Sequence, residues 1–481
     1  MSEIRVFHSH IEVYPYEKGD CEDLERMMSK WDPSTYSRIP IGYFIQNNIL
    51  YLPRGVNTAL LENWFNTTPI PVFKCDDYNK IKTGVAKLPP KSTMQENGIK
   101  FLTGTDEYSY TGRYSQLGLN LDTGDGKTYA TIYAILKMKI KTIIITHQTK
   151  LKQQWIKTLE EKTSFPMENL CDISGGDVID QIMKGKIKAE IYCVNHQTLH
   201  SYARVHGWNS IREFFKKIKV GIKVVDEAHK FFESTLMLDY FSNCYKSFYL
   251  TATFGRSDPS EIAIYKRAFS SLARYGEETA NYEEKRKHIN FVIVYFRSKP
   301  EYGISPNVRT NYGFSSYKYI DYELKGEPYN TLEKVLFHIL DETKQLEGKT
   351  LIISPKKETV TKIAKDVSEY TGESVGTVFS ANSDEVNRLN LEKNIISSTV
   401  KSIGEGTDIS KLRVLINLEP IGSKPLADQV RGRLREYSED KDTYLFYPVD
   451  LTVPETSNFL KRILPVMKKK CKGIFIEKYM I

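Results

Sequence analysis

The stretch LDTGDGKTYAT, residues 121–131, decides the fold of this chain. Within it, GDGKT offers glycines whose backbone N–H groups can approach phosphate oxygens, a lysine that adds a point charge and a threonine whose hydroxyl can bind magnesium. The strict phosphate-loop pattern requires glycine at the position of Leu121, so the motif is incomplete. A surface turn with the same residues therefore remains an alternative. The residues that would surround the phosphates are Thr123, Gly124, Asp125, Gly126, Lys127 and Thr128.

The residues that follow this loop favour phosphate binding over a simple turn. Tyr129 to Met138 is apolar at roughly helical spacing, and TIIIT at 142–146 is typical of a buried strand. A glycine loop that opens a helix places the N-terminal amides of that helix against an anion. The stretch therefore predicts a phosphate-binding loop at the start of a helix.

Strands and helices alternate along most of the chain. One block runs from 95 to about 255 and includes EIYCVNH at 190, and a second runs from NFVIVYF at 290 to TYLFYP at 443. Near-continuous apolar strands joined by helices are typical of parallel sheets covered on both faces. We expect an α/β fold with two doubly wound parallel-sheet lobes in tandem, at 89–283 and 284–481, after a small N-terminal α/β domain at 1–88.

Residues 1–88 are expected to form a small domain of their own, and Pro89-Pro90 is a plausible linker between this domain and the first lobe. The hydrophobic periodicity and turn residues of this domain predict a strand at Arg5–Tyr14, a helix at Glu22–Lys30, a hairpin of Gly42–Gln46 and Ile49–Pro53 around Asn47-Asn48, and a helix at Val56–Phe65.

Composition limits the class of protein. The 481 residues are 40% hydrophobic, and the six cysteines form no CxxC pair, so neither a zinc cluster nor a disulfide framework is indicated. No signal peptide or membrane-spanning run is visible, which predicts a cytoplasmic protein, in the host cytoplasm if the source is viral. The net charge is +8, and residues 461–481 hold seven Lys or Arg against Glu477. This basic C-terminal tail could contact polyphosphate or form the solvated face of a terminal helix.

VVDEAH at 224–229 ends an apolar strand with two adjacent acids. The carboxyl end of a strand is where an open α/β sheet presents its binding edge. There Asp226 can bind magnesium, and Glu227 can orient or deprotonate the attacking water. A helix N-cap would explain an isolated DEAH, but here a phosphate loop precedes it.

The order of these and further motifs resembles that of superfamily 2 helicases and translocases over about residues 90–450. A narrower resemblance, to UvsW-type phage helicases and the poxvirus transcript-release helicase, rests on the small first domain, ILYLPRG at 49–55 and IYKRAFSSL at 264–272. The further family motifs are THQTKLKQQW (146–155), VNHQTL (194–199), TAT (251–253), TLIISP (350–355), GEGTDI (404–409) and QVRGRLR (429–435).

The family resemblance implies two RecA-like lobes that use ATP and Mg²⁺, and it assigns residue roles. Lys127, Glu227, Arg433 and Arg435 would be catalytic, and Thr128 and Asp226 would hold the metal. Nucleotide would also contact Gln95, Gly406, Asp408 and Gln429. His229, Thr251 and Thr253 would couple the nucleotide state to nucleic acid, which Thr149, Lys150, Gln197, Thr198, Ser354 and Thr399 would contact.

Two of these assignments stay open in the sequence. The family spaces its two arginines as GRxxR, but here Arg435 falls one place early and Glu436 stands at the expected position, which makes Arg431 a further candidate for the arginine finger. Gln95 either reads adenine or simply begins a helix.

We expect a monomeric ATP-dependent helicase or translocase that acts on branched or duplex DNA in phage or viral replication and recombination, with proteins of those pathways as candidate partners. One alternative is a transcript-release or RNA-unwinding ATPase of the same fold. Another is a non-catalytic nucleic-acid clamp or scaffold, motivated by the shifted arginine and by Asp125. The tyrosine-rich stretch from Phe296 to Tyr322 predicts either an insertion that stacks on bases or a hairpin packed on the second lobe.

Overall fold

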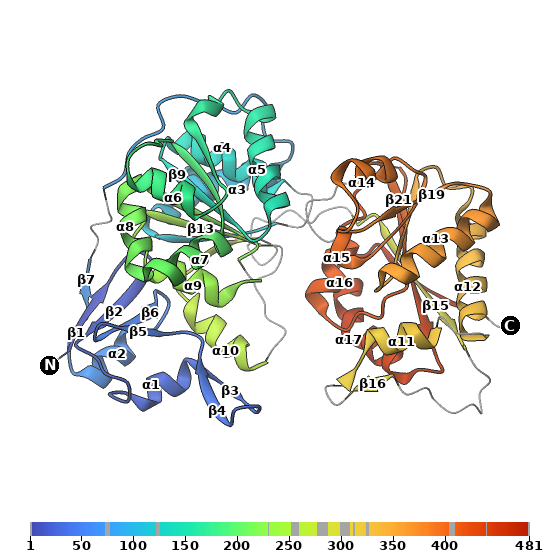
Figure 1. Ribbon diagram of the computed structural model, residues 1–481, viewed down its shortest axis with the longest axis horizontal. Helices are drawn as coiled ribbons and strands as arrows, with labels where there is room; N and C mark the ends of the chain where they lie inside the picture. Colours follow the sequence, from blue (N-terminus) through green and yellow to red (C-terminus); the bar gives the residue numbers. More distant parts are fainter. Residues whose placement is uncertain are drawn as a thin grey trace. The chain divides into compact units, whose positions relative to one another are not determined.

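The computed structural model places two seven-stranded sheets in two separate units, Met1–Glu284 and Lys285–Ile481 (Figure 1). The first unit also contains a five-stranded N-terminal sheet. The described residues are 2–72, 77–121, 126–228, 230–251, 259–276, 287–298, 308–310, 313–323, 327–403, 409–438 and 440–479.

The first seven-stranded sheet is parallel throughout, in the order β10-β11-β9-β12-β13-β8-β14. Side chains of a strand alternate between faces, so Ile144 packs in the core beneath α3, α4 and α5, whereas Ile143 and Ile145 pack in the core beneath α6 to α10. The strands are β8 (Gln116–Asn120), β9 (Thr142–Thr146), β10 (Leu170–Ile173), β11 (Ile191–Asn195), β12 (Ile222–Asp226), β13 (Lys246–Thr251) and β14 (Ala273–Tyr275).

Helices cover both faces of this sheet, as the doubly wound prediction requires. The phosphate-loop helix begins at Lys127, and the predicted strand TIIIT is β9. The helices are α3 (Thr93–Thr103), α4 (Lys127–Met138), α5 (Thr149–Lys162), α6 (Gly176–Met183), α7 (His196–His206), α8 (Trp208–Ile218), α9 (Phe232–Tyr240) and α10 (Pro259–Ala268), with 3₁₀ turns η1 (Asp106–Arg113) and η2 (Met167–Asn169).

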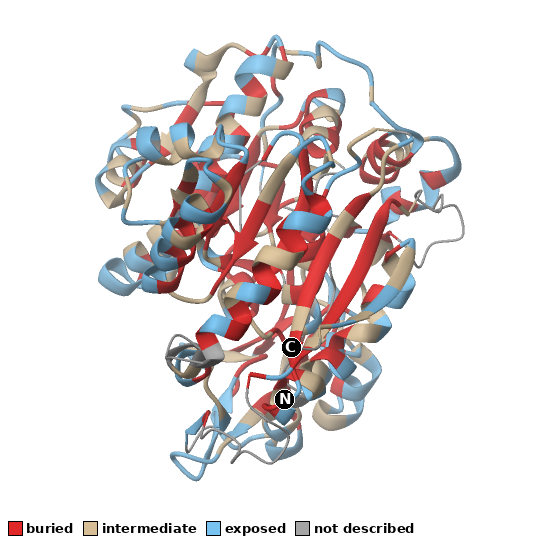
Figure 2. Cartoon of the chain, turned by 90° about the vertical axis from the view of Figure 1, so that its right-hand side faces the viewer, coloured by how far each residue is buried: buried red, intermediate tan, exposed pale blue. Residues whose placement is uncertain are grey.

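The second unit repeats the design with the strand order β19-β20-β18-β21-β22-β15-β23, again all parallel. Figure 2 shows its buried strands beneath helices whose outer faces are exposed. The fold class is therefore confirmed for both lobes. The strands are β15 (Ile289–Phe296), β18 (Lys349–Ile353), β19 (Val375–Val378), β20 (Ile395–Ser398), β21 (Leu412–Asn417), β22 (Thr443–Asp450) and β23 (Gly473–Lys478).

The helices of this unit are α11 (Ser316–Glu323), α12 (Glu327–Thr343), α13 (Lys357–Thr371), α14 (Asp384–Leu391), α15 (Val400–Ile403), α16 (Lys424–Arg431) and α17 (Pro454–Lys470). Part of the basic C-terminal stretch forms a terminal helix, which is one of the two alternatives that the sequence offered. Its first half is the end of α17, and its second half is β23, which pairs with β15 at the edge of the sheet.

The described part of the tyrosine-rich stretch forms a small hairpin, β16 (Arg309–Thr310) with β17 (Gly313–Phe314), before α11. Val308 and Tyr319 share a small core with Val453, and the ring of Phe314 lies 4.9 Å from that of Phe459. This confirms a hairpin packed on the second lobe for residues 308–310 and 313–323. Residues 299–307 lie outside the described part of the chain.

The N-terminal sheet has the order β5-β6-β2-β1-β7. The prediction of one strand from Arg5 to Tyr14 is wrong, because Phe7 N–H donates to His10 O over 2.8 Å and turns the chain into an antiparallel hairpin. The turn at Asn47-Asn48 is confirmed, with φ of 54° and 58°, as a tight hairpin requires. The elements are β1 (Glu3–Val6), β2 (His10–Tyr14), α1 (Glu22–Met27), β3 (Ser29–Asp32), β4 (Ser37–Pro40), β5 (Phe44–Gln46), β6 (Ile49–Pro53), α2 (Thr58–Phe65) and β7 (Ile70–Pro71).

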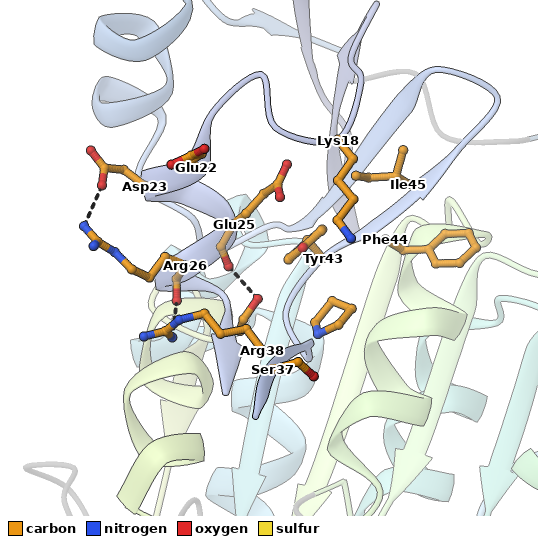
Figure 3. A pocket seen from close by; sticks show the side chains of 12 residues that line it. Lys18, Glu22, Asp23, Glu25, Arg26, Ser37, Arg38, Tyr43, Phe44 and Ile45 are labelled. Atoms are coloured by element: carbon orange, nitrogen blue, oxygen red, sulfur yellow. Dashed lines mark hydrogen bonds and ion pairs between the residues drawn. The ribbon is translucent and has the colours of Figure 1, made fainter. Parts of the chain in front are cut away.

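Both predicted N-terminal helices are shorter in the structure. The first ends at Met27, where the chain enters a second hairpin, β3 with β4, and the second begins at Thr58 rather than at Val56. Beside this hairpin, α1 and β5 line a cavity of about 640 Å³ (Figure 3). Some of the charged side chains that line the cavity pair with one another, since Arg26 lies 2.7 Å from Asp23.

None of the helices in the described residues combines the length and apolarity that crossing a bilayer needs.

The N-terminal sheet shares one hydrophobic core with the adjoining lobe, in which Ile11 and Leu52 pack with Phe232 and Tyr265. Arg212 of α8 binds Glu12 of β2 at 3.0 Å and lies over the Phe241 ring. Burial of this much apolar surface makes the two parts one mechanical body.

Gly55, the last residue of ILYLPRG, brings its backbone against the backbone of the adjoining lobe. Its N–H donates to Ala268 O at 3.2 Å, and its carbonyl accepts from the Ser270 hydroxyl. A Cβ at this position would meet Ala268 O at 2.5 Å and Ser270 N at 2.7 Å. Only glycine fits, because the neighbouring atoms are backbone and cannot turn aside.

Gly55→Ala should therefore loosen the N-terminal sheet. We expect it to lower the free energy of unfolding by about 1–3 kcal/mol, the usual cost of overpacking, and to speed proteolysis within residues 2–72. Gly112→Ala is the matched control, since a Cβ there meets nothing within 4 Å. Denaturant titration and limited proteolysis measure both effects, and equal behaviour of the two variants would contradict the packing argument.

Candidate nucleotide and nucleic-acid site

The predicted motifs of the first lobe follow the carboxyl ends of neighbouring parallel strands. Asn195 of β11 is in register with Thr146 of β9, and Thr251 of β13 with Asn120 of β8, while Asp226 ends β12 between them. Because the strands are parallel, these ends meet at one edge of the sheet, where open α/β sheets bind ligands.

The phosphate loop reaches α4 through Gly126, which adopts a φ of +80°. A Cβ on Gly126 would lie 2.1 Å from Gln95 Nε2, so the Gln95 side chain packs directly against the loop. Gln95 is buried, and its Oε1 accepts the Lys91 N–H at 2.9 Å. The structure thus brings Gln95 to the loop, and its reading of adenine stays a prediction. Thr123, Gly124 and Asp125 lie outside the described residues.

Lys127 opens α4, and its Nζ donates to Leu121 O at 2.7 Å. A lysine folded back over its own loop places positive charge where phosphate oxygens would lie. Thr128 follows in the first turn and is half-buried.

Asp226 is the most constrained group at this edge. Burial raises the pKa of its carboxyl, and the charge of Glu227 adds to the rise, while the Trp155 N–H and Lys127 oppose it. Trp155 Nε1 donates to one carboxylate oxygen at 2.8 Å, and Glu227 N–H donates to the other at 3.0 Å. A buried carboxylate beside a second acid is the donor set that Mg²⁺ prefers, so these residues fit a magnesium ion.

Glu227 itself has a φ of +51°, in the left-handed region that non-glycine residues rarely adopt. Ala228 N–H donates to Leu250 O at 3.1 Å, and Lys230 N–H donates back to Glu227 O at 2.9 Å. These bonds hold the turn after the strand. Strained backbone of this kind gathers at functional sites. His229 and Thr253 lie outside the described residues, and Thr251 is fully buried at the end of β13.

The predicted nucleic-acid residues of this lobe lie in the first turns of two helices, Thr149 and Lys150 in α5, and Gln197 and Thr198 in α7. Asn195, which sequence reasoning missed, ties the two turns together. Its amide donates to Thr149 Oγ1 at 3.0 Å and accepts from Thr146 Oγ1 at 2.9 Å.

A cavity of about 490 Å³ adjoins these turns. Gly175 and Gly176 at the start of α6 line it together with Gln197, Thr198 and Tyr202. The sequence signal that could have found it is Gly-Gly after a strand, since glycines before a helix expose backbone N–H groups.

Two buried histidines stand behind this surface. Burial lowers the pKa of His147 and of His196 to about 4, so both imidazoles are neutral near pH 7. The Phe231 ring lies 4.2 Å from the His196 ring and 5.3 Å from the His147 ring. Phe231 thereby connects the segment after the DEAH motif with both nucleic-acid motifs.

The predicted site residues of the second unit differ in exposure. Arg431 is buried and binds Asp428 at 2.8 Å, and Asp428 also binds Lys470 at 2.7 Å. Arg433 is half-buried, and Arg435 is exposed. Because Arg431 is committed to this ion pair, Arg433 and Arg435 remain the predicted fingers.

The other residues of that unit are placed as follows. Ser354 is fully buried at the end of β18, so its hydroxyl does not face solvent. Thr399 Oγ1 accepts the Ser402 N–H at 3.2 Å and begins α15. Gln429 lines a small pocket with Arg433. Gly406 and Asp408 lie outside the described residues. Contact of Ser354 and Thr399 with nucleic acid stays a prediction.

Comparison with known proteins agrees with this geometry. The family described as "Type III restriction enzyme, res subunit" matches residues 92–256, which contain the phosphate loop, DEAH and their supporting strands. The chain carries a superfamily 2 helicase ATPase domain.

Individual relatives are distant. Transcript termination protein A18 of Yaba-like disease virus is 23% identical over 445 residues, covering 86% of each chain. Mss116p bound to ssRNA and AMP-PNP shares the fold, with a TM-score of 0.54, 15% identity and coverage of 82% of this chain and 75% of that chain. T4 UvsW aligns over 99% of each chain with 14% identity and a TM-score of 0.37.

Trp155 lies at the predicted site, and sequence reasoning quoted it within a motif but gave it no role. It lies in α5, the helix that begins at Thr149, and only 1% of it is exposed. Its N–H is the side-chain donor to Asp226 in the described structure. One rigid helix therefore joins a predicted nucleic-acid contact to the predicted metal ligand.

Trp155→Phe should weaken magnesium binding. Without the donor the pKa of Asp226 rises further, so a smaller fraction of the carboxyl is ionised at a given pH. We expect the Mg²⁺ concentration for half-maximal ATP hydrolysis to rise on the order of tenfold, the effect of a lost bond to a buried charge, and to rise more as the pH falls.

Trp208→Phe is the matched control, because the Trp208 ring packs on Phe241 and edge-on against His200, and neither of these is a predicted metal or nucleotide residue. An unchanged Mg²⁺ dependence in Trp155→Phe would show that Trp155 contributes packing only.

Proposed function

We propose that this helicase is an ATP-driven motor that releases a transcript from its template. The observation that carries the proposal is the similarity to transcript termination protein A18, which spans 86% of this chain and so is not confined to the two motor lobes. The comparisons support this alternative better than the branched-DNA motor that the sequence first suggested. Branch migration and recombination have no support from them.

The first lobe supports nucleotide use. Lys127 and Thr128 at the start of α4 would bind phosphates and Mg²⁺, and Asp226 would complete the metal site. The bound Mg²⁺ would neutralise charge on the phosphate oxygens. Glu227 would orient the attacking water from its strained turn, and Arg433 with Arg435 would stabilise the transferring phosphoryl group. Gln95 against Gly126 would select the base of ATP.

The surface beside this site suits nucleic acid without base recognition. The first turns of α5, α6 and α7 present backbone N–H groups and short polar side chains, which grip phosphates independently of sequence. A motor that removes a transcript must move along any sequence. A surface of this chemistry meets that need for either DNA or RNA strands.

The experiment compares three substrates whose strands have the same lengths and the same end structures. They are an RNA annealed within a DNA bubble, a DNA strand in the same bubble, and a four-way DNA junction. We expect ATP-dependent release to be fastest for the RNA, and Lys127→Ala to abolish it. Preference for the junction would overturn the transcript proposal in favour of branch migration. Binding without hydrolysis on every substrate would favour the clamp or scaffold.

The α7 turn should contribute directly to nucleic-acid binding. Gln197→Ala with Thr198→Ala should raise the nucleic-acid concentration for half-maximal ATPase stimulation by roughly 30-fold, since two hydrogen bonds are lost at about 1 kcal/mol each. Gln181→Ala, an exposed glutamine on α6 outside the cavity, is the control. Equal half-maximal concentrations for the double variant and for Gln181→Ala would show that the nucleic-acid strand binds elsewhere.

A further inference from the structure

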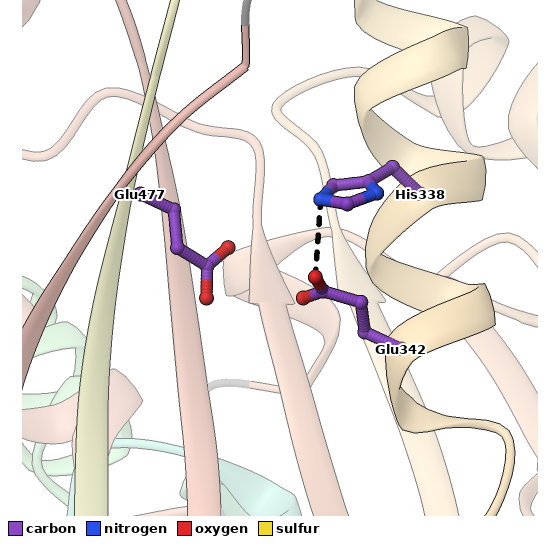
Figure 4. Close-up of side chains that lie close together, drawn as sticks. All are labelled: His338, Glu342 and Glu477. Atoms are coloured by element: carbon purple, nitrogen blue, oxygen red, sulfur yellow. Dashed lines mark ion pairs between the residues drawn. The ribbon is translucent and has the colours of Figure 1, made fainter.

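A cluster of three metal-ligating side chains lies in the second unit among residues to which no motif assigns a role. His338 and Glu342 stand one turn apart on α12, and Glu477 projects toward them from β23 (Figure 4). One ligand atom from each lies within 4.8 Å of the others. His338 Nε2 and Glu342 Oε1 are 3.3 Å apart.

The negative charge in this cluster is incompletely balanced. Glu477 Oε2 is buried and has no hydrogen-bond partner among the described residues. Burial raises the pKa of Glu477, and the charge of Glu342 raises it further. A buried carboxylate oxygen normally finds a donor or a cation, so the pair of carboxylates around one imidazole provides a place for a positive ion.

The spacing fits a small tetrahedral cation. Two atoms bound at about 2.0–2.1 Å to one zinc ion lie roughly 3.3 Å apart, and the His338–Glu342 pair already has this separation. A Glu477 carboxylate oxygen lies within 4.8 Å of both and would have to move closer to complete the triangle. The Tyr479 ring, 5.2 Å from that of His338, packs beside the imidazole and restricts its orientation.

We propose that His338, Glu342 and Glu477 form a binding site for a divalent transition-metal cation such as Zn²⁺. One imidazole with two carboxylates is a donor set for zinc-like ions rather than for Mg²⁺ or Ca²⁺, which prefer oxygen ligands alone. Three protein ligands leave the fourth position for water.

The site has a structural consequence for the second lobe. β23 is the last strand of the sheet and an edge strand, held by pairing with β15 on one side only. A cation shared by α12 and β23 fastens this edge to a helix whose Val335 and Ile339 are buried in the core. Since the bound ion stabilises the folded state alone, its binding free energy adds to stability.

The test uses the full chain, stripped of metal with a chelator, and titrated with Zn²⁺ in competition with a chromophoric zinc indicator. Excess Mg²⁺ is present to fill the site at Asp226. Glu477→Gln and His338→Gln should weaken one Zn²⁺ site by more than about 100-fold, because losing even an outer partner of a metal ligand costs roughly 10- to 100-fold.

Asp341→Asn is the matched control. It neighbours Glu342 on α12 but bonds to Tyr370 at 2.7 Å, outside the cluster. It should keep wild-type affinity. Zn²⁺ should also raise the melting temperature of the wild type and of Asp341→Asn, and leave that of Glu477→Gln unchanged, with circular dichroism confirming that each variant folds.

Cobalt provides a second readout. Co²⁺ bound at this site should give the visible bands of a four-coordinate ion with nitrogen and oxygen ligands. Thiolate charge-transfer bands, or equal Zn²⁺ affinity in the wild type and in Glu477→Gln, would overturn the proposal and reduce the cluster to the His338–Glu342 ion pair.

Discussion

The burial of one carboxylate, that of Asp226, constrains the arrangement of the first lobe. Asp226 ends a strand whose five residues are all buried, so its charge is desolvated at the edge where the neighbouring strands also end. A charge in that position requires donors and a cation. The Trp155 N–H, the Glu227 amide and the nearby Lys127 meet the requirement from three different segments. Lys127 at the start of α4, the DEAH turn and α5 therefore all lie against this carboxylate.

The same carboxylate links the two predicted ligand surfaces of the lobe. α5 carries Thr149 at its first turn and Trp155 two turns later, and the Asn195 amide joins α5 to the start of α7. A helix transmits displacement because its backbone hydrogen bonds leave few soft torsions. A change at the predicted metal site would therefore reach the predicted nucleic-acid turns through packed and hydrogen-bonded groups.

The N-terminal sheet is part of this body rather than an appendage. Its apolar face completes the core under α9 and α10, and Arg212 of the lobe is satisfied by Glu12 of the sheet. Gly55 permits backbone to lie against backbone at the junction. A segment joined in this way moves with the first lobe, so any strand it touches would be carried along by the same hydrolysis cycle.

The sequence by itself determined the α/β class, the doubly wound lobes, the presence of a helix directly after the glycine loop and the position of Asp226 at a strand end. These follow from local periodicity and from the geometry of a glycine loop before a helix, which depend on neighbours in the chain.

Only the tertiary structure decided which distant side chains meet. Trp155 against Asp226, Gln95 against Gly126, and Glu477 near His338 depend on strand order and helix placement, which local periodicity does not encode. The same reason explains the errors. The predicted strand from Arg5 to Tyr14 became a hairpin through one turn bond at Phe7, and only the last part of the basic C-terminal stretch left the helix, to pair with β15 as β23. Pairing across the fold overrode what composition suggested.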